Sequence, residues 1–98
     1  MKKPGSASRE TTELLAIQAL AFIAEDPERM AAFLSATGLE ATAIRDAARA
    51  PVFLAGVLEH MLSDESLLLA FADSAGIDPA EIARAHNVLG KAWESDLP

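Results

Sequence analysis

The sequence predicts an all-α protein, a compact bundle of five to six short helices built from two tandem pseudo-symmetric three-helix repeats. Three observations lead to this prediction. The sequence matches itself at a fixed offset of 38 residues, helix start and stop signals recur at that offset, and the apolar residues between them follow helical spacing. We expect the two repeats to pack against each other, because neither can cover its apolar side chains alone.

The internal match runs without insertion or deletion over about 13–50 and again over 51–88. The matching positions in the first copy are Asp26, Met30, Ala32, Phe33, Gly38, Leu39, Ile44 and Ala47. The same positions in the second copy are Asp64, Leu68, Ala70, Phe71, Gly76, Ile77, Ile82 and Ala85. Phe33 and Phe71 should therefore occupy equivalent places in one core.

The first helix is expected to follow a polar tail. Residues 1–12 contain no periodic apolar pattern, and we expect them to form a flexible tail outside the core. Either Thr11 or Thr12 can cap the helix by accepting a hydrogen bond from an amide of its first turn. The predicted helix ends near Ala24.

Two aspartates and two glycines mark the boundaries of the next helices. Asp26 and Asp64 can each cap a helix start, and in the first copy Pro27 fits the first helical position without losing a needed amide. Gly38 and Gly76 can each adopt the left-handed conformation that closes a helix. The pattern predicts one helix between each aspartate and its glycine.

A shorter helix is expected after each glycine. It covers about 40–49 in the first copy and runs from Asp78 to near Gly90 in the second. Pro51 separates the copies, because proline disfavours helical geometry at the residue before it and can itself begin a helix. One helical domain over residues 13–92 is predicted, with 93–98 as a short tail.

The helix that begins at Pro51 has the clearest apolar stripe. Its members recur in adjacent pairs every four residues and are Phe53, Leu54, Val57, Leu58, Met61 and Leu62. This helix must lie on the core.

The next helix has no polar face over residues 67–72. Successive helical residues are turned by about 100°, so Leu67, Leu68 and Leu69 cannot all point inward. In one interpretation this helix is sandwiched between the two repeats. In the other, part of the leucine run forms a groove for an unidentified protein partner or a homodimer face, to which Trp93 contributes an aromatic anchor.

Composition and charge narrow the possible functions. A chain of 98 residues that is 51% apolar can form one core, and the absence of cysteine excludes disulfides, thiolate metal sites and cysteine nucleophiles. Without cysteine, and without an apolar run typical of a signal peptide or membrane span, the cytoplasm is the expected compartment. The net charge of −7 argues against binding to nucleic acid and to anionic membranes.

Two stretches resemble a known family. FLSATGLEATAIRDAA and PVFLAGVLEHMLSDESLLLAFADSAGIDP are similar to the bacterial family catalogued as domain of unknown function 3572. The similarity covers about residues 14–90, and its most distinctive pieces are Thr37-Gly38-Leu39, residues 51–54, and Asp64-Glu65 with the leucines that follow. The resemblance implies a small, all-helical cytoplasmic protein. It implies no known activity, so it assigns no catalytic or binding residue.

No part of the sequence supports a catalytic, cofactor or metal site. Glu59-His60 followed by Asp64-Glu65 is the only cluster that resembles one, and it lacks the second histidine of a zinc-binding helix pair. Asp64 is more simply a helix cap, and His86 has no carboxylate at helical spacing. The glycines form no phosphate-binding loop, and no serine lies in a glycine-flanked elbow.

The most specific alternative is a helix-turn-helix that binds nucleic acid. The required core and turn positions would be Phe71, Ala72, Gly76, Ile77 and Ile82. The helix that would read DNA, however, opens with acidic side chains. Under this alternative the candidate nucleic-acid contacts are Arg45, Arg49 and Arg84.

The sequence leaves the biochemical function unknown and favours one class of function. We expect a small noncatalytic cytoplasmic protein-protein interaction or regulatory domain, with a divergent helix-turn-helix nucleic-acid-binding regulator as the alternative. The expected mechanism is docking through a helix face.

Overall fold

The structure, a computed structural model, describes the backbone of residues 4–95 and the side chains of residues 10–90. Within this part, the chain is all-helical, as predicted. Its elements are α1 (Pro4–Ala24), α2 (Pro27–Thr37), the 3₁₀ turn η1 (Ala41–Ala43), α3 (Ile44–Ala47), α4 (Pro51–Leu62), α5 (Glu65–Ala75) and α6 (Pro79–Ser95).

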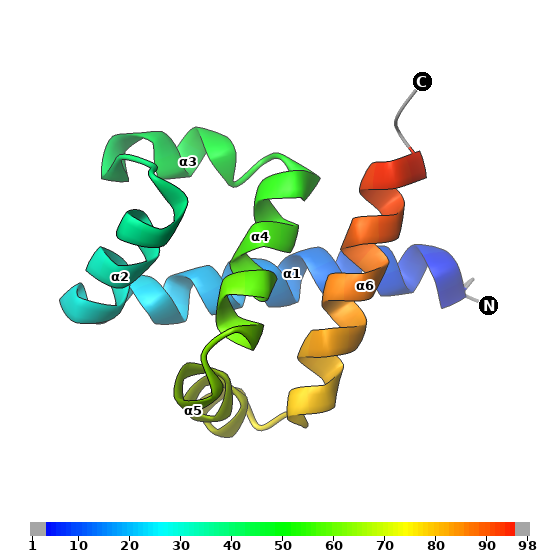
Figure 1. Cartoon of the computed structure of the whole chain (residues 1–98). Coiled ribbons are helices and arrows are strands. Elements are labelled where there is room, and N and C mark those ends of the chain that lie inside the picture. Colours follow the sequence, from blue (N-terminus) through cyan, green and yellow to red (C-terminus); the bar gives the residue numbers. More distant parts are fainter. Residues whose placement is uncertain (1–3, 96–98) are drawn as a thin grey trace.

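The helices form a bundle in which α1 crosses behind α4 and α6 (Figure 1). The helices α4 and α6 lie side by side, and α6 packs on both α4 and α1. At one end α2 packs on α1, α3 connects α2 to the start of α4, and α5 lies at the opposite end of α4. The radius of gyration is 13.2 Å, close to the value of about 13 Å for a compact chain of 100 residues.

Both predicted aspartate caps form. The Asp26 side chain accepts hydrogen bonds from the amides of Glu28 at 2.8 Å and Arg29 at 3.4 Å. The Asp64 side chain accepts one from the amide of Leu67 at 3.2 Å. The first amides of a helix have no carbonyl partner within the helix, and each carboxylate accepts a hydrogen bond from such amides. These hydrogen bonds fix where α2 and α5 begin.

Both predicted glycine stops also form. Gly38 has φ 74° and Gly76 has φ 70°, and no other described residue has a positive φ. The Gly38 amide donates to the carbonyl oxygen of Leu34 at 2.8 Å, and the Gly76 amide donates to the carbonyl oxygens of Ala72 and Asp73. The left-handed backbone, which glycine adopts at little cost, turns the chain out of α2 and α5.

Two predicted helix ends are wrong. The first helix begins at Pro4 rather than near Thr11 or Thr12, so most of the predicted 1–12 tail is helical. Pro4 fits a first helical position, and a helix can continue through residues that carry no apolar pattern. The last helix continues beyond Gly90 to Ser95, into the predicted 93–98 tail, because Gly90 does not adopt the left-handed conformation.

The helix predicted over 40–49 is shorter and less regular than expected. The chain forms η1 and then a single α-helical turn, α3, neither of which has a side-chain cap. Glu40 and Ala43 occupy the cap positions and make no side-chain hydrogen bond to the first turn. Pro51 then starts α4, so α3 has no room to lengthen.

The core is a single cluster to which α1, α4 and α6 contribute most residues. Its largest fully buried side chains are Phe33, Ile23, Leu58, Met61, Ile82, Leu89 and Val57. Aromatic pairs join the outer helices to this cluster. The Phe22 and Phe71 rings lie 5.5 Å apart, and the Phe33 ring lies 6.0 Å from Phe53 and 5.2 Å from His60, measured between ring centroids.

Truncation of either buried phenylalanine tests the core. Phe33→Ala and Phe71→Ala should each lower the free energy of unfolding by about 3–5 kcal/mol, because each leaves a cavity that the core fills only partly. Urea titration measures the change. Leu69→Ala, on the same helix as Phe71 but 49% exposed, is the control and should cost less than about 1 kcal/mol. A phenylalanine variant that melts within about two degrees of the parent would contradict the described core.

Substitution of the aspartate caps tests the helix starts. Asp26→Ala and Asp64→Ala should each cost about 1 kcal/mol in the free energy of unfolding, whereas Asp64→Asn should cost much less, because the asparagine oxygen can still accept the amide hydrogen bond. Thermal melting of the three variants measures this. Equal losses for Asp64→Ala and Asp64→Asn would show that the carboxylate acts through its charge and not as a cap.

Candidate functional site

The leucine run of α5 does not form one surface. Leu67 is only 7% exposed and belongs to the core, and Leu68 is half-buried and packs against it. Leu69 alone is open to solvent, at 49% exposure. The side chain of Trp93, the proposed anchor, lies outside the described residues.

Leu69 is isolated among polar neighbours. Glu65 and Asp73 are exposed and lie four residues before and after it, so they flank it on the same side of α5. A single leucine between two carboxylates provides little apolar area for a partner.

A larger exposed apolar surface lies on α1. Leu14 is 61% exposed and Ile17 is 45% exposed, and Ala21 and Ala24 are exposed as well. Spacings of three and four residues place these four side chains in one row along the helix. We call this row, Leu14, Ile17, Ala21 and Ala24, the α1 outer face.

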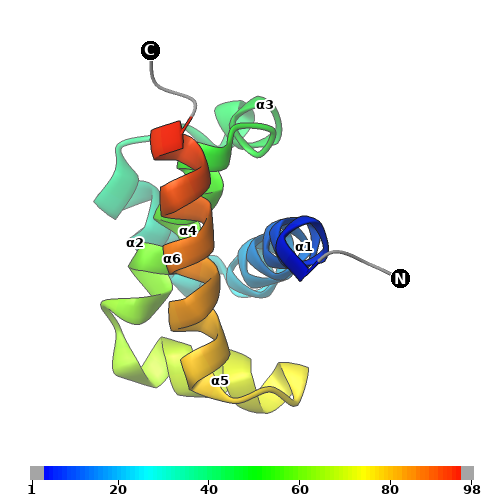
Figure 2. The ribbon, with the colours of Figure 1, turned by 90° about the vertical axis from the view of Figure 1, so that its right-hand side faces the viewer.

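The opposite side of α1 belongs to the core. Ala16, Ala19 and Ile23 are fully buried beneath the other helices. Figure 2 shows α1 end-on, and none of the other helices drawn there covers the side of α1 that is turned away from α4 and α6. Although α1 is apolar on two sides, none of the described helices is both long and apolar enough to span a membrane.

Sequence reasoning missed the α1 outer face. The signal was present, because Gln18 is the only polar residue between Leu14 and Ala24. A helix with so few polar residues cannot direct every apolar side chain to one core. The apolar run of α5 is similar in sequence, but Leu67, Phe71 and Ala72 of that run are buried.

Carboxylates lie at both ends of the α1 outer face. Glu10 precedes Leu14 by four residues and Glu25 follows Ala21 by four, and both are exposed. Exposed Gln18 borders the middle of the row. The surface is therefore apolar along its length and acidic at its two ends.

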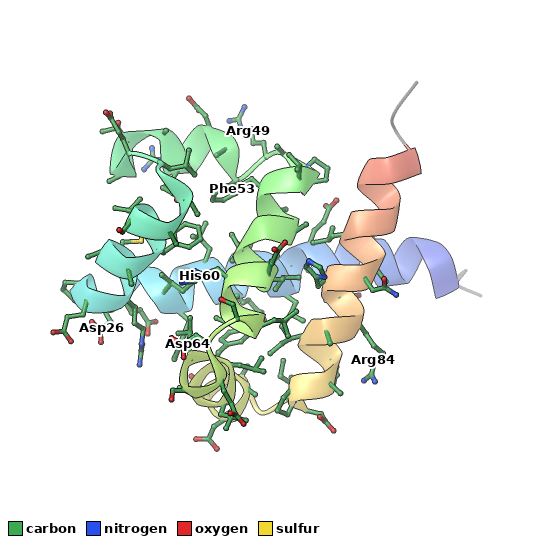
Figure 3. The ribbon with its side chains drawn as sticks, viewed as in Figure 1. Asp26, Arg49, Phe53, His60, Asp64 and Arg84 are labelled. Atoms are coloured by element: carbon green, nitrogen blue, oxygen red, sulfur yellow. The ribbon has the colours of Figure 1, made fainter. Side chains whose placement is uncertain are left out.

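The histidine and acidic cluster of the sequence is dispersed over several contacts. The His60 ring packs edge-on against the Phe33 ring, and Asp64 caps α5 (Figure 3). Glu59 instead lies near His86, with 3.6 Å between Glu59 Oε1 and His86 Nε2. Among the described side chains, no group of three histidine, aspartate or glutamate residues could hold a metal ion.

A shallow groove of about 340 Å³ separates the first half of α1 from α6. It is lined by Thr11, Thr12, Leu15, Glu81, Arg84, Ala85 and Val88. Arg84 and Glu81 bring opposite charges to the same wall, so neither a cationic nor an anionic ligand is favoured by net charge. The described lining of the groove offers hydrophobic contact and hydrogen bonds.

The three arginines of the nucleic-acid alternative do not form one surface. Arg49 lies beside the start of α4, whereas Arg84 lies on α6 at the other side of the molecule (Figure 3). Arg45 is on α3, which is a single turn and too short to act as a recognition helix. A contiguous phosphate-binding surface would require these charges side by side.

The helix-turn-helix geometry of α5 and α6 is a packing arrangement. Phe71 and Ile82 are buried on either side of the Gly76 turn. The exposed start of α6 carries Asp78 and Glu81, which would repel the phosphate backbone in a DNA groove.

Titration with DNA tests the nucleic-acid alternative. A labelled random duplex should show no binding at tens of micromolar protein, even at about 20 mM salt, because the net charge is −7 and the arginines are dispersed. Fluorescence anisotropy measures this. The outcome that would support nucleic-acid binding is an affinity that falls steeply with salt and is lost in the Arg45→Ala, Arg49→Ala double variant.

Comparison with known proteins gives a family without an assigned activity. No curated protein and no solved structure matches the chain. One family model, described as "Protein of unknown function (DUF3572)", matches residues 9–92. This match covers most of the chain, including α2, α3, α4 and α5 in full and most of α1 and α6. The chain therefore belongs to the DUF3572 family.

Proposed function

We propose that this protein is a small noncatalytic interaction domain of the cytoplasm that binds a protein partner through the α1 outer face. The observation that carries the proposal is the row of exposed apolar side chains on α1, led by Leu14 at 61% and Ile17 at 45% exposure. Single exposed apolar residues are ordinary on protein surfaces, but a contiguous row marks an interaction site more often.

The α1 outer face is a better docking surface than the leucine run of α5. Its four apolar residues extend over three turns of helix, whereas Leu69 is the only exposed leucine of α5. A partner that covers several adjacent side chains removes more apolar area from water than one that covers a single leucine. The docking mechanism predicted from the sequence is retained, with a different helix as its surface.

We further propose that the bundle consists of two tandem three-helix repeats related by a pseudo-twofold rotation. Reciprocal ring contacts support this arrangement. Phe22 of the first repeat packs on Phe71 of the second, and the residues equivalent to them, His60 and Phe33, pack on each other. A twofold relation requires such paired contacts. Phe22 contacts the equivalent of Phe33, and Phe33 contacts the equivalent of Phe22.

A pull-down from native lysate tests the proposed function. The wild type should capture partners that Ile17→Glu loses, because a carboxylate in the middle of the α1 outer face would be buried without a counter-charge on docking. Val52→Glu is the matched control, since Val52 is 50% exposed on a different helix and should leave the captured proteins unchanged. Far-UV circular dichroism and a melting curve confirm that each variant folds.

Two outcomes would contradict this proposal. Identical captured proteins for the wild type, Ile17→Glu and Val52→Glu would remove the α1 outer face as the docking surface. Loss of partners only with Leu69→Glu would assign docking to α5.

A further inference from the structure

The two proposed repeats differ most in their third helix. The third helix of the second repeat, α6, has 17 residues, whereas that of the first, α3, has 4. The repeat offset equates Pro51, where α4 begins, with Leu89 in the middle of α6. The third helix of the first repeat must therefore end before Pro51, whereas the third helix of the second repeat continues through the equivalent position, Leu89.

In the second repeat, α6 covers one side of α4. Glu59 on this side lies 3.6 Å from His86 of α6. Ala55 and Leu62 lie four residues before and three residues after Glu59, so they share its side of the helix, and both are half-buried against the core. These three residues define the α6-facing side of α4.

Three of the four residues of the α1 outer face are the equivalents of this side in the first repeat. At the repeat offset, Ala55, Glu59 and Leu62 correspond to Ile17, Ala21 and Ala24. Ile17 and Ala24 are exposed where Ala55 and Leu62 are half-buried, because α3 is too short to lie over α1 as α6 lies over α4. Ala21 is exposed, and so is its equivalent Glu59. The apolar surface on α1 is thus the place that a full-length third helix of the first repeat would occupy.

We infer that the α1 outer face binds an amphipathic helix of a partner protein, and that this helix takes the place of the missing third helix of the first repeat. The inference rests on the proposed function and names the class of partner. The bound helix should resemble α6, which buries Ile82, Ala85 and Leu89 at spacings of three and four residues. Recognition of a helix through such a row is a common mode of binding between proteins.

The charges around the α1 outer face specify a basic partner helix. Glu10 and Glu25, which directly follows α1, stand at its two ends, 15 residues apart, or about 22 Å at the helical rise of 1.5 Å per residue. Lysine or arginine near both ends of the partner helix would complement these carboxylates. A second copy of this chain is disfavoured, because pairing of two α1 helices in either direction brings glutamates near glutamates between molecules of net charge −7.

Peptide binding tests the inference. The probe is a fluorescein-labelled 18-residue helical peptide with Ile, Ala and Leu in the α6 spacing and lysines near both ends, titrated with the full chain by anisotropy. A second peptide has the same apolar residues with glutamates in place of the lysines. We expect the lysine peptide to bind about tenfold or more tightly at low salt, since several favourable charge pairs are replaced by unfavourable ones.

Matched protein variants locate the binding site. Ile17→Glu should weaken binding of the lysine peptide about tenfold or more, whereas Val52→Glu should leave it within about twofold. Glu10→Gln with Glu25→Gln should also weaken binding. The control is Glu65→Gln with Asp73→Asn, which removes the same amount of charge from α5 and should leave peptide binding unchanged.

Each other outcome overturns the inference in an identifiable way. Equal binding of the two peptides would reject a basic partner, and equal binding to wild type and Ile17→Glu would reject the site. Absence of binding up to about millimolar protein would reject an α6-like helix. Sedimentation equilibrium that shows a dimer dissociated by Ile17→Glu would assign a second copy as the occupant. The pull-down decides the proposed function separately, because it requires neither a helical nor a basic partner.

Discussion

The close packing of α1 against α4 and α6 is the interaction on which the other contacts of the bundle depend. Ala16 and Ala19 are fully buried on α1, and such small side chains let large ones such as Leu58 and Met61 of α4 fill the space between the helices. The outer helices α2 and α5 then attach through their phenylalanines, since Phe33 packs on rings of α4 and Phe71 on a ring of α1. Loss of the central packing would leave both rings without their partners.

The parts of the fold that could be predicted are those determined by local hydrogen bonding. Asp26 and Gly38 act within one turn of their own helix, so their neighbours in sequence decide their roles. The start of α1 and the end of α6 were not predicted, because residues 4–12 carry no apolar period and Gly90, the expected stop, does not adopt the left-handed conformation. The site was harder to predict. The positions of the other helices decide which apolar residues of α1 and α5 are buried. Leu67 and Ile17 both lie in apolar runs, and only the tertiary structure separates them.

The proposed function follows from an asymmetry between two otherwise similar halves. In the proposed two-repeat arrangement, the second repeat has a long third helix that covers one side of α4, whereas the third helix of the first repeat ends early because α4 begins at Pro51. The consequence is an apolar row on α1 with carboxylates at both ends, on a helix whose other side anchors the core. A binding surface on such a helix is held rigidly, which reduces the conformational entropy lost on docking. The carboxylates at the two ends of the α1 outer face and the net charge of −7 would both favour association with basic partners.

The most direct test of this asymmetry is the rate of thiol labelling at two equivalent positions. The chain has no cysteine, so Ile17→Cys and Ala55→Cys each introduce a single reporter without further changes. Under native conditions a small maleimide should modify Ile17→Cys at nearly the rate seen in denaturant, and Ala55→Cys several-fold more slowly, because α6 covers that side of α4. Equal labelling rates at the two positions would contradict the account, since they would show that the two faces are covered alike.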